Sequence, residues 1–478
     1  MSCNSGSINP YISSVQKPWD TRLIQHFYRR IGFGATSNEI AQALIQEPSL
    51  FIDEVIEKVY NLPSTIPPSW AYMKESDYTD IDTQMQEQHV EWYLKWENDM
   101  LVNPIRGRFT LFWSNHFVTR LEDYWCSSWM FDYYKVIQEN SFGNFKNFVK
   151  EIGLAPAMLI FLNGYQNSAA EPNENYAREL YELFTLGVNN GYTQNDIVET
   201  ARALTGYTRI DEYCAPISFD INEFDHTEKT IFGRTGNWGY NDVIDILFEE
   251  RGTQIANFIC EKLYKYFISP EINSVIISEL ATTLITNNFE LVPVYKQLFK
   301  SEHFFNDNAI GILIKSPFDL LNIHFRETEF STESEMLLNL VWFCSEIGQT
   351  MFEPVDVAGW QGNHDWINSS TLVGRWNAFD YFLWWTWEDN KESFRDFVVN
   401  LVGESNNPSE ITKIVVDHLL SNSLQTELDY EIATDIFKDE IPQNYFDNNQ
   451  WNLQWDTVPY QVIVLLFHII RQPEFQLK

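Results

Sequence analysis

The sequence predicts a mainly α-helical protein: a large multi-helix, bundle-like fold with two long irregular loops and at most a small β-hairpin. Apolar residues recur at intervals of three and four along most of the chain, as in helices that bury one face. Ser, Thr or Asn at the expected starts and Gly at the expected ends divide these stretches into separate helices. Hydrophobic residues make up 44% of the 478 residues, enough for a sizeable interior. Two long stretches after residue 20, residues 209–238 and 348–376, lack helical periodicity.

The N-terminal third begins with residues 1–20, which are polar and predict an extended segment. Residues 21–478 predict a single large helical domain, for which subdomains 21–155 and 156–478 are an alternative division. Within it, residues 85–117 form one or two long aromatic helices broken near Asn103-Pro104, since proline cannot continue a helix. His116 ends this stretch. A histidine among aromatic residues is usually part of the core, and a metal or proton-transfer role is the alternative.

The segment Pro172 to Gly187 organises the middle of the chain. If Asn173 caps a helix here, Glu174, Arg178 and Glu182 share one face, with Glu179 three residues before Glu182. The opposite face is apolar, and Gly187 suits the left-handed conformation that ends a helix.

A short turn follows, and Thr193-x-x-Asp196 resembles a capping box that opens a second helix to about Leu204. The short connection predicts antiparallel helices, with Glu199 and Arg202 near the carboxylates of the first.

The two irregular stretches hold the remaining candidate residues. Residues 209–238 alternate aromatic and charged residues around His226, as in a short hairpin or an ordered loop. An ordered loop of this length in a helical protein is usually functional. Residues 348–376 contain Gly359-Trp360 and His364.

Charge and cysteine content exclude several classes of function. Asp+Glu 67 against Lys+Arg 32 gives a net charge of −35, which repels phosphate backbones, so we expect no nucleic-acid partner. The longest apolar run, residues 462–470, is too short to span a membrane. The five cysteines are scattered without a C-x-x-C pair, which argues against disulfide stapling and a thiolate zinc site. No signal peptide is found, which indicates a cytoplasmic protein unless a partner carries it to the periplasm or outside the cell.

Several motifs together resemble a known family. These are R-I-G-F-G-A-T at 30–36, F-W-S-N-H-F at 112–117, P-A-M-L-I-F-L-N at 156–163, N-E-N-Y-A-R-E-L-Y-E-L-F-T-L-G at 173–187, Y-T-Q-N-D-I at 192–197, A-R-A-L-T-G-Y at 201–207, H-T-E-K-T-I-F-G at 226–233, K-S-P at 315–317, G-W at 359–360 and P-E-F at 473–475. Over nearly its full length the chain is similar to the bacterial domain of unknown function 1800 family, which is uncharacterised.

The resemblance implies a mostly helical bacterial protein. It also implies a partner of the domain of unknown function 1501 type, whose members resemble sulfatases and alkaline phosphatases and often carry twin-arginine signals. Two positions depart from the family pattern. Thr227 follows His226 where the family usually has Asp, and Gln361 follows Gly359-Trp360 where it usually has Pro.

Two function hypotheses follow. In the first, the protein is an enzyme of envelope or secreted-polymer metabolism, a hydrolase or oxidoreductase. Its catalytic residues would be Glu174, Arg178, Glu179, Glu182 and His226. Helical bundles build metal centres from inward-facing Glu and His, so His116, Glu179, Glu182 and His226 are candidate ligands for Fe, Mn or Zn. Paired carboxylates without a metal are an alternative catalyst.

In the second hypothesis the chain is a non-catalytic accessory or escort subunit of the sulfatase- or phosphatase-like partner. The carboxylates then form an ion-pair ladder along one helix, which is a structural feature rather than a site. An escort should show an exposed apolar patch, whereas an enzyme should show an enclosed polar pocket.

Overall fold

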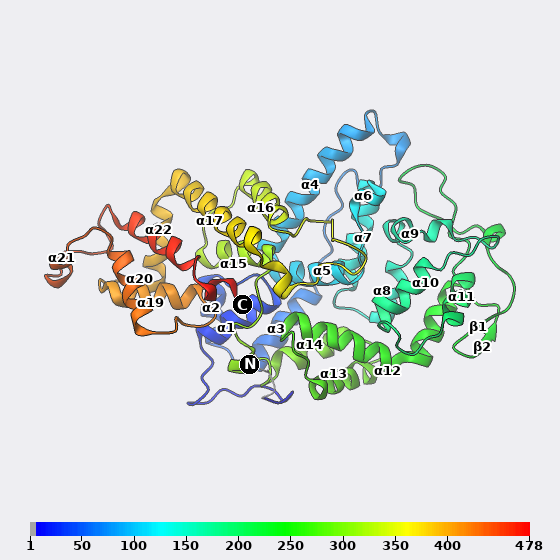
Figure 1. Cartoon of the computed structure of the whole chain (residues 1–478), viewed down its shortest axis with the longest axis horizontal. Coiled ribbons are helices and arrows are strands. Elements are labelled where there is room, and N and C mark those ends of the chain that lie inside the picture. The colour runs from blue at the N-terminus through cyan, green and yellow to red at the C-terminus, as the bar shows by residue number, and fades with distance from the viewer. Residues whose placement is uncertain (1–5) are drawn as a thin grey trace.

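A computed structural model describes residues 6–478, and it is mainly α-helical, as the sequence predicts (Figure 1). The helices of the N-terminal part are α1 (Thr21–Ile31), α2 (Ser37–Leu44), α3 (Pro48–Tyr60), α4 (Ile81–Val102), α5 (Pro104–His116), α6 (Leu121–Tyr124), α7 (Ser127–Asn140), α8 (Phe145–Ile152), α9 (Pro156–Phe161), α10 (Asn175–Glu179) and α11 (Gln194–Ala203). The later helices are α12 (Tyr240–Phe267), α13 (Ser274–Thr286), α14 (Leu291–Lys300), α15 (Pro317–Thr328), α16 (Ser334–Glu346), α17 (Ser369–Asn390), α18 (Glu392–Val402), α19 (Pro408–Leu419), α20 (Glu427–Lys438), α21 (Gln443–Asp447) and α22 (Val458–Ile469).

The helices lie around α5 and α15, with α17–α22 on one side and α7–α11 on the other (Figure 1). The long helix α12 returns along the lower edge in this view, with α13 and α14 beside it. One cluster of buried hydrophobic residues extends through the chain from Tyr11 to Phe475. No helix within residues 6–478 has the length and apolar character needed to cross a membrane. Residues 6–20 contain no helix, and the rest of the predicted extended segment, residues 1–5, lies outside the described part.

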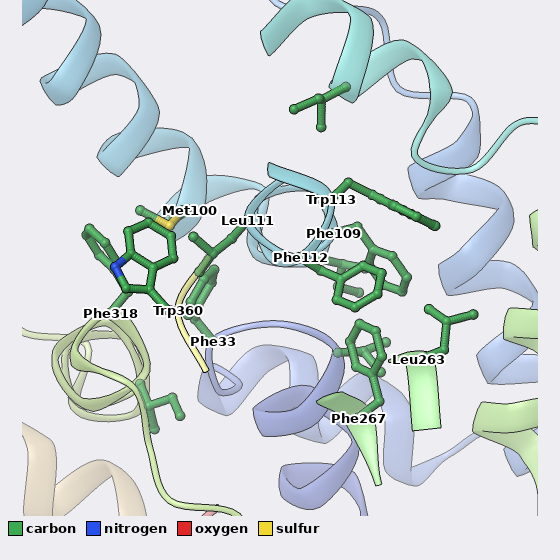
Figure 2. Packing of buried hydrophobic residues seen from close by; sticks show 14 of the residues in the cluster. Phe33, Met100, Phe109, Leu111, Phe112, Trp113, Leu263, Phe267, Phe318 and Trp360 are labelled. Atoms are coloured by element: carbon green, nitrogen blue, oxygen red, sulfur yellow. The ribbon is translucent and has the colours of Figure 1, made fainter. Parts of the chain in front are cut away.

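The central helix α5 begins at Pro104, which separates it from α4 as the sequence predicts. Nearly every side chain of α5 is buried. Figure 2 shows Phe109, Phe112 and Trp113 on the side facing α12, where the Phe109 ring stacks on Phe267 with centroids 5.0 Å apart. Burying each such side chain contributes about 1.5–3 kcal/mol, so this packing holds α5 firmly in place.

Gly107 sets the close crossing of α4 and α5. A Cβ atom at this position would lie 2.9 Å from the backbone Cα of Met100, closer than real contacts allow. Without a side chain at 107, the two helices approach closely directly after the Pro104 break.

The predicted hairpin is present and small. Strands β1 (Lys229–Ile231) and β2 (Arg234–Gly236) pair antiparallel. Phe232 and Gly233 form the turn, both with positive φ, as a two-residue hairpin loop of this kind requires. The second irregular stretch is shorter than predicted, because Asn368 caps α17 by accepting hydrogen bonds from the backbone N–H of Ser370 and Thr371.

The cysteines depart from the sequence prediction. Cys126 and Cys214 form a disulfide, with Cα atoms 5.8 Å apart, and both are buried. The expectation of no disulfide stapling is therefore wrong for this pair. The two residues are 88 positions apart and share no spacing motif, and only the tertiary fold brings the start of α7 to the loop after α11.

A buried ion pair joins α1 to α15. The Arg29 guanidinium donates two hydrogen bonds to the Glu327 carboxylate, at 2.6 and 2.7 Å, and both side chains are almost fully enclosed. Removing one member of such a pair typically costs 3–5 kcal/mol. The C-terminal segment lies beside the start of α15, where Ile314 and Leu477 form an antiparallel bridge.

Candidate functional site

The predicted carboxylate face is an ion-pair ladder. Arg178 contacts Glu174 at 3.0 Å and Glu182 at 3.3 Å, each four residues away along the chain. These side chains are partly exposed, and such pairs contribute only about 0.3–0.5 kcal/mol each. Burial, and then the neighbouring Glu182, raises the pKa of Glu179. The structure thus brings Glu174, Arg178 and Glu182 together as the sequence predicts, with Glu179 beside them.

The helix that carries the ladder is shorter than predicted. Helix α10 ends at Glu179, and residues Leu180–Thr185 (η3) form a π-helical turn in which the Leu186 N–H donates to the Tyr181 carbonyl, 2.8 Å away. Glu174 directly precedes α10 and makes no side-chain cap. The Asn173 side chain, one residue earlier, accepts a hydrogen bond from the Asn175 N–H. Wider turns of this type leave carbonyls free for other partners and often occur at functional sites.

The capping box at Thr193 and Asp196 is confirmed, but the second helix meets the ladder differently than expected. Gln194, at the start of α11, donates to Glu174 at 2.8 Å. Glu199 and Arg202 instead face the hairpin loop, where Arg202 pairs with Glu199 and Asp225, both at 2.8 Å. The predicted placement of Glu199 and Arg202 beside the ladder is therefore wrong.

His226 lies apart from the ladder, on an exposed loop. Its Nε2 is 3.1 Å from the Ile221 carbonyl, and its ring meets Phe224 edge-on. Although partial burial opposes it, hydrogen bonds from Thr227 and then Arg202 lower the pKa of Asp225 to about 2. Arg202 also donates to the Thr227 hydroxyl, so the residue that departs from the family pattern helps to fix this loop.

The four predicted metal ligands are not gathered at one point. His116 is buried beside α12, Glu179 and Glu182 lie on the ladder, and His226 is on the exposed loop. Within residues 6–478 no group of three or more His, Cys, Asp or Glu side chains is arranged to hold a metal ion. His116 is the one predicted site residue that lines a cavity beside α5 and α12.

That cavity, of about 380 Å³, lies between α5, α12, the start of α15 and residues 358–366. The side chains that form the site are Phe112, His116, Lys262, Tyr266, Asp319 and Trp360. Pockets of this size accommodate small molecules. We refer to it as the Lys262 pocket.

A fixed loop covers one side of the pocket. The Asn115 side chain donates to the Trp360 carbonyl at 2.9 Å and accepts from the Trp360 N–H at 2.7 Å. Gly359 has φ of +78°, and a Cβ there would lie 2.3 Å from the Asn115 Oδ1 atom. Only glycine fits this position, so Gly359 and Asn115 together hold Trp360 in the pocket wall.

Lys262 and His116 form the polar pair of the pocket. The Lys262 ammonium donates to His116 Nδ1 at 3.2 Å and to the Leu183 carbonyl at 3.3 Å. Because Lys262 has no acceptor atom, His116 Nδ1 is the acceptor, and Nε2–H donates to the Phe184 carbonyl at 3.0 Å. Both carbonyls belong to the π-helical turn, which thereby orients the pair.

The electrostatics of this pair are unusual. Burial, and then the nearby Lys265, lowers the pKa of Lys262 to about 8. Burial, and then Lys262, holds the pKa of His116 well below its ordinary value, so the imidazole is neutral at pH 7. Lys265 is ion-paired to Glu261 at 2.6 Å, whereas Lys262 forms no ion pair within the described chain.

The inner end of the pocket holds a compensated ion cluster. Asp319 pairs with Arg108, and the Lys478 ammonium donates to Asp319 at 2.5 Å. Burial opposes the shift, but Arg108 and then Lys478 hold the pKa of Asp319 well below its usual range. Burial, and then Arg108, lowers the pKa of Lys478 to about 7. The negative charge of Asp319 is therefore balanced by two cations, whereas the positive charge of Lys262 has no carboxylate partner.

Comparison with known proteins identifies the family. A family model described as "Protein of unknown function (DUF1800)" matches residues 26–477. The chain belongs to this family. No curated protein and no solved structure matches it. In this DUF1800 chain, the motifs around Asn115-His116, Ser316 and Gly359-Trp360 meet at the Lys262 pocket. The motif at 173–187 supplies the π-helical turn whose carbonyls bind Lys262 and His116.

Sequence reasoning missed three residues of the pocket: Lys262, Asn115 and Asp319. Asn115 lies in the aromatic motif beside His116, and Asp319 completes the Ser316 capping box, so both had a local signal. Lys262 had none, because a lysine within a long helix is usually exposed, and only the fold encloses it.

Proposed function

We propose that this DUF1800 protein is an enzyme that binds a small organic anion in the Lys262 pocket and uses Lys262 and His116 for binding and proton transfer. One observation carries the proposal: Lys262 is a half-buried cation that lines a pocket and has no carboxylate partner. A buried charge without a counter-ion is costly, and an anionic ligand would supply the missing partner.

The charge pattern of the pocket supports an anionic ligand. The whole chain carries a net charge of −35, yet Lys262, Lys265 and Lys478 all line this cavity. The two carboxylates that line it, Glu261 and Asp319, already have cationic partners. An anion repelled by the rest of the surface would therefore find a locally favourable potential here.

The pocket walls indicate the rest of the ligand. Phe112, Tyr266, Trp360 and Trp366 line the cavity with aromatic surface. Aromatic faces pack well against flat or ring-shaped groups such as sugar rings. A carboxylated or phosphorylated ring compound fits both the cation and the walls, in keeping with a role in envelope or secreted-polymer metabolism.

The chemistry we propose is proton transfer at Lys262. With its pKa near 8, Lys262 exchanges a proton close to neutral pH, and the neutral His116 imidazole fixes its position. General acids and bases work best when their pKa lies near the operating pH. Metal chemistry with Fe, Mn or Zn, expected from the sequence, has no gathered ligand set to support it among the described residues, and the proposal uses none.

The disulfide supports export of the protein. Disulfides such as Cys126–Cys214 form in oxidising compartments and are rare in the bacterial cytoplasm. We therefore propose that the chain works in the periplasm or outside the cell, where a partner of the domain of unknown function 1501 type could accompany it.

Thermal unfolding with a panel of small carboxylates and sugar phosphates tests the binding proposal. A ligand at one hundred times its dissociation constant adds about 2.7 kcal/mol of stability, a rise of a few degrees in Tm. We expect Lys262→Met to lose this rise and Lys265→Met, on the same pocket wall, to keep most of it. A rise that Lys262→Met retains, or no rise with any member of the panel, would contradict the proposal.

The escort hypothesis also has a specific observation in its favour. Trp384 is 44% exposed on α17, beside Tyr381 and Trp385, in a shallow surface groove rimmed by Glu388 and Asp389. Exposed aromatic surface of this kind is typical of protein interfaces. Co-expression with a protein of the domain of unknown function 1501 type tests it: the two should co-purify, and Trp384→Ser should abolish this while the variant still unfolds cooperatively. Independent purification of the two proteins would sink the escort hypothesis.

A further inference from the structure

The Lys262 pocket also meets the requirements for covalent chemistry at an amine, an inference that rests on the proposed function. A lysine amine becomes nucleophilic when its charged form is disfavoured by desolvation in a pocket or by a neighbouring cationic group. Lys262 has His116 Nδ1 at 3.2 Å and the Leu183 carbonyl at 3.3 Å as its hydrogen-bond partners, lies over the Phe258 ring, 5.0 Å from its centroid, and lines the cavity.

We infer that Lys262 forms an imine with the carbonyl carbon of a small ligand that also carries an anionic group, such as a 2-oxo acid or an acidic aldehyde. In the first step the neutral amine attacks the carbonyl carbon, a C–N bond forms, and the carbonyl oxygen takes a proton. In the second step the C–O bond breaks and water leaves, so one carbonyl and one amine give one imine and one water. No oxidant or reductant is needed.

The groups around Lys262 hold its amine in place. The neutral His116 imidazole accepts a hydrogen bond from Lys262 at Nδ1, 3.2 Å away, and the proton that the amine must lose before it attacks passes to solvent in the cavity. The nearby Lys265 lines the same cavity, but it makes no hydrogen bond to His116 or to the π-helical turn. Its ammonium is ion-paired to Glu261 at 2.6 Å. Lys265 is therefore a matched control, a second lysine one helical turn away in the same pocket.

Reductive trapping with glyoxylate tests the inference. Sodium cyanoborohydride reduces an imine with glyoxylate to a stable carboxymethyl-lysine, which peptide mapping locates. At limiting glyoxylate and pH 7 we expect Lys262 to be labelled at least tenfold faster than Lys265. His116→Phe should slow the labelling of Lys262 several-fold, and His116→Gln should restore part of it. Labelling of Lys265 and surface lysines ahead of Lys262 would overturn the inference.

Lys262→Arg separates this inference from the proposed function. Arginine keeps the positive charge but cannot form an imine, so the variant should keep the ligand-induced rise in Tm and lose the label at this position. Stabilisation of the wild type by small anions without trapping at Lys262 would leave the binding proposal standing and remove the imine. Trapping at Lys262 without stabilisation by any anion would support the imine and contradict the binding proposal.

Discussion

At the scale of single residues, the fold buries the Glu97 carboxyl group where its ionised form is disfavoured. Glu97 on α4 is fully buried, and burial raises its pKa to about 8, an effect that the nearby Asn322 only partly offsets. The carboxyl is therefore protonated in the folded protein at pH 7, whereas it is ionised in the unfolded chain above its ordinary pKa near 4.5.

This difference makes stability depend on pH with a definite sign. The contribution of Glu97 is complete below about pH 4.5 and is lost as the pH rises to about 8, at about 1.4 kcal/mol per pH unit. We expect Glu97→Gln, which stays neutral, to be more stable than the wild type at pH 8 by a few kcal/mol, and the gap to close toward pH 5. Urea unfolding at both pH values measures it, and an equal effect at both would contradict the account.

At the scale of elements, the loop over the pocket depends on one side chain. Asn115 makes both hydrogen bonds that hold Trp360, and Gly359 leaves the space for them. Asn115→Ala should cost about 1–3 kcal/mol, because it leaves buried backbone groups without partners. Hydrogen exchange should speed up in residues 356–366 and stay unchanged in α13, which serves as an internal control. Unchanged exchange in the loop would show that Asn115 does not hold it.

Elements also differ in how far the sequence could predict them. The break at Pro104 and the capping box at Thr193 follow from local rules and are confirmed, and a small hairpin is present within residues 209–238, where a hairpin or an ordered loop is predicted. The π-helical turn 180–185 has no local rule, because the partners of its carbonyls come from α5 and α12. The ladder at Arg178 was predictable from spacing alone, whereas the Lys262 pair depends on residues 146 positions apart.

At the scale of the whole molecule, the disulfide links distant parts of the chain and reports on its environment. Cys126 and Cys214 close a loop across 88 positions, and such a bond typically contributes 2–5 kcal/mol. In denatured protein purified without reductant, peptide mapping should find Cys126 joined to Cys214, and Cys260 and Cys344 as free thiols. A reductant should lower Tm in the wild type but not in a Cys126→Ser/Cys214→Ser variant. Five free thiols would show that the bond does not form.

The central claim is that, in a very acidic helical protein, the half-buried Lys262 lines a pocket without a counter-ion and is ready for an anionic ligand. The most direct test is the pH dependence of acylation at Lys262, followed by peptide mapping under trace reagent. The account predicts a midpoint near pH 8, because burial lowers the pKa, and a slower reaction when a bound anion covers the amine. A midpoint in the ordinary lysine range near 10.5, unaffected by any anion, would contradict the account.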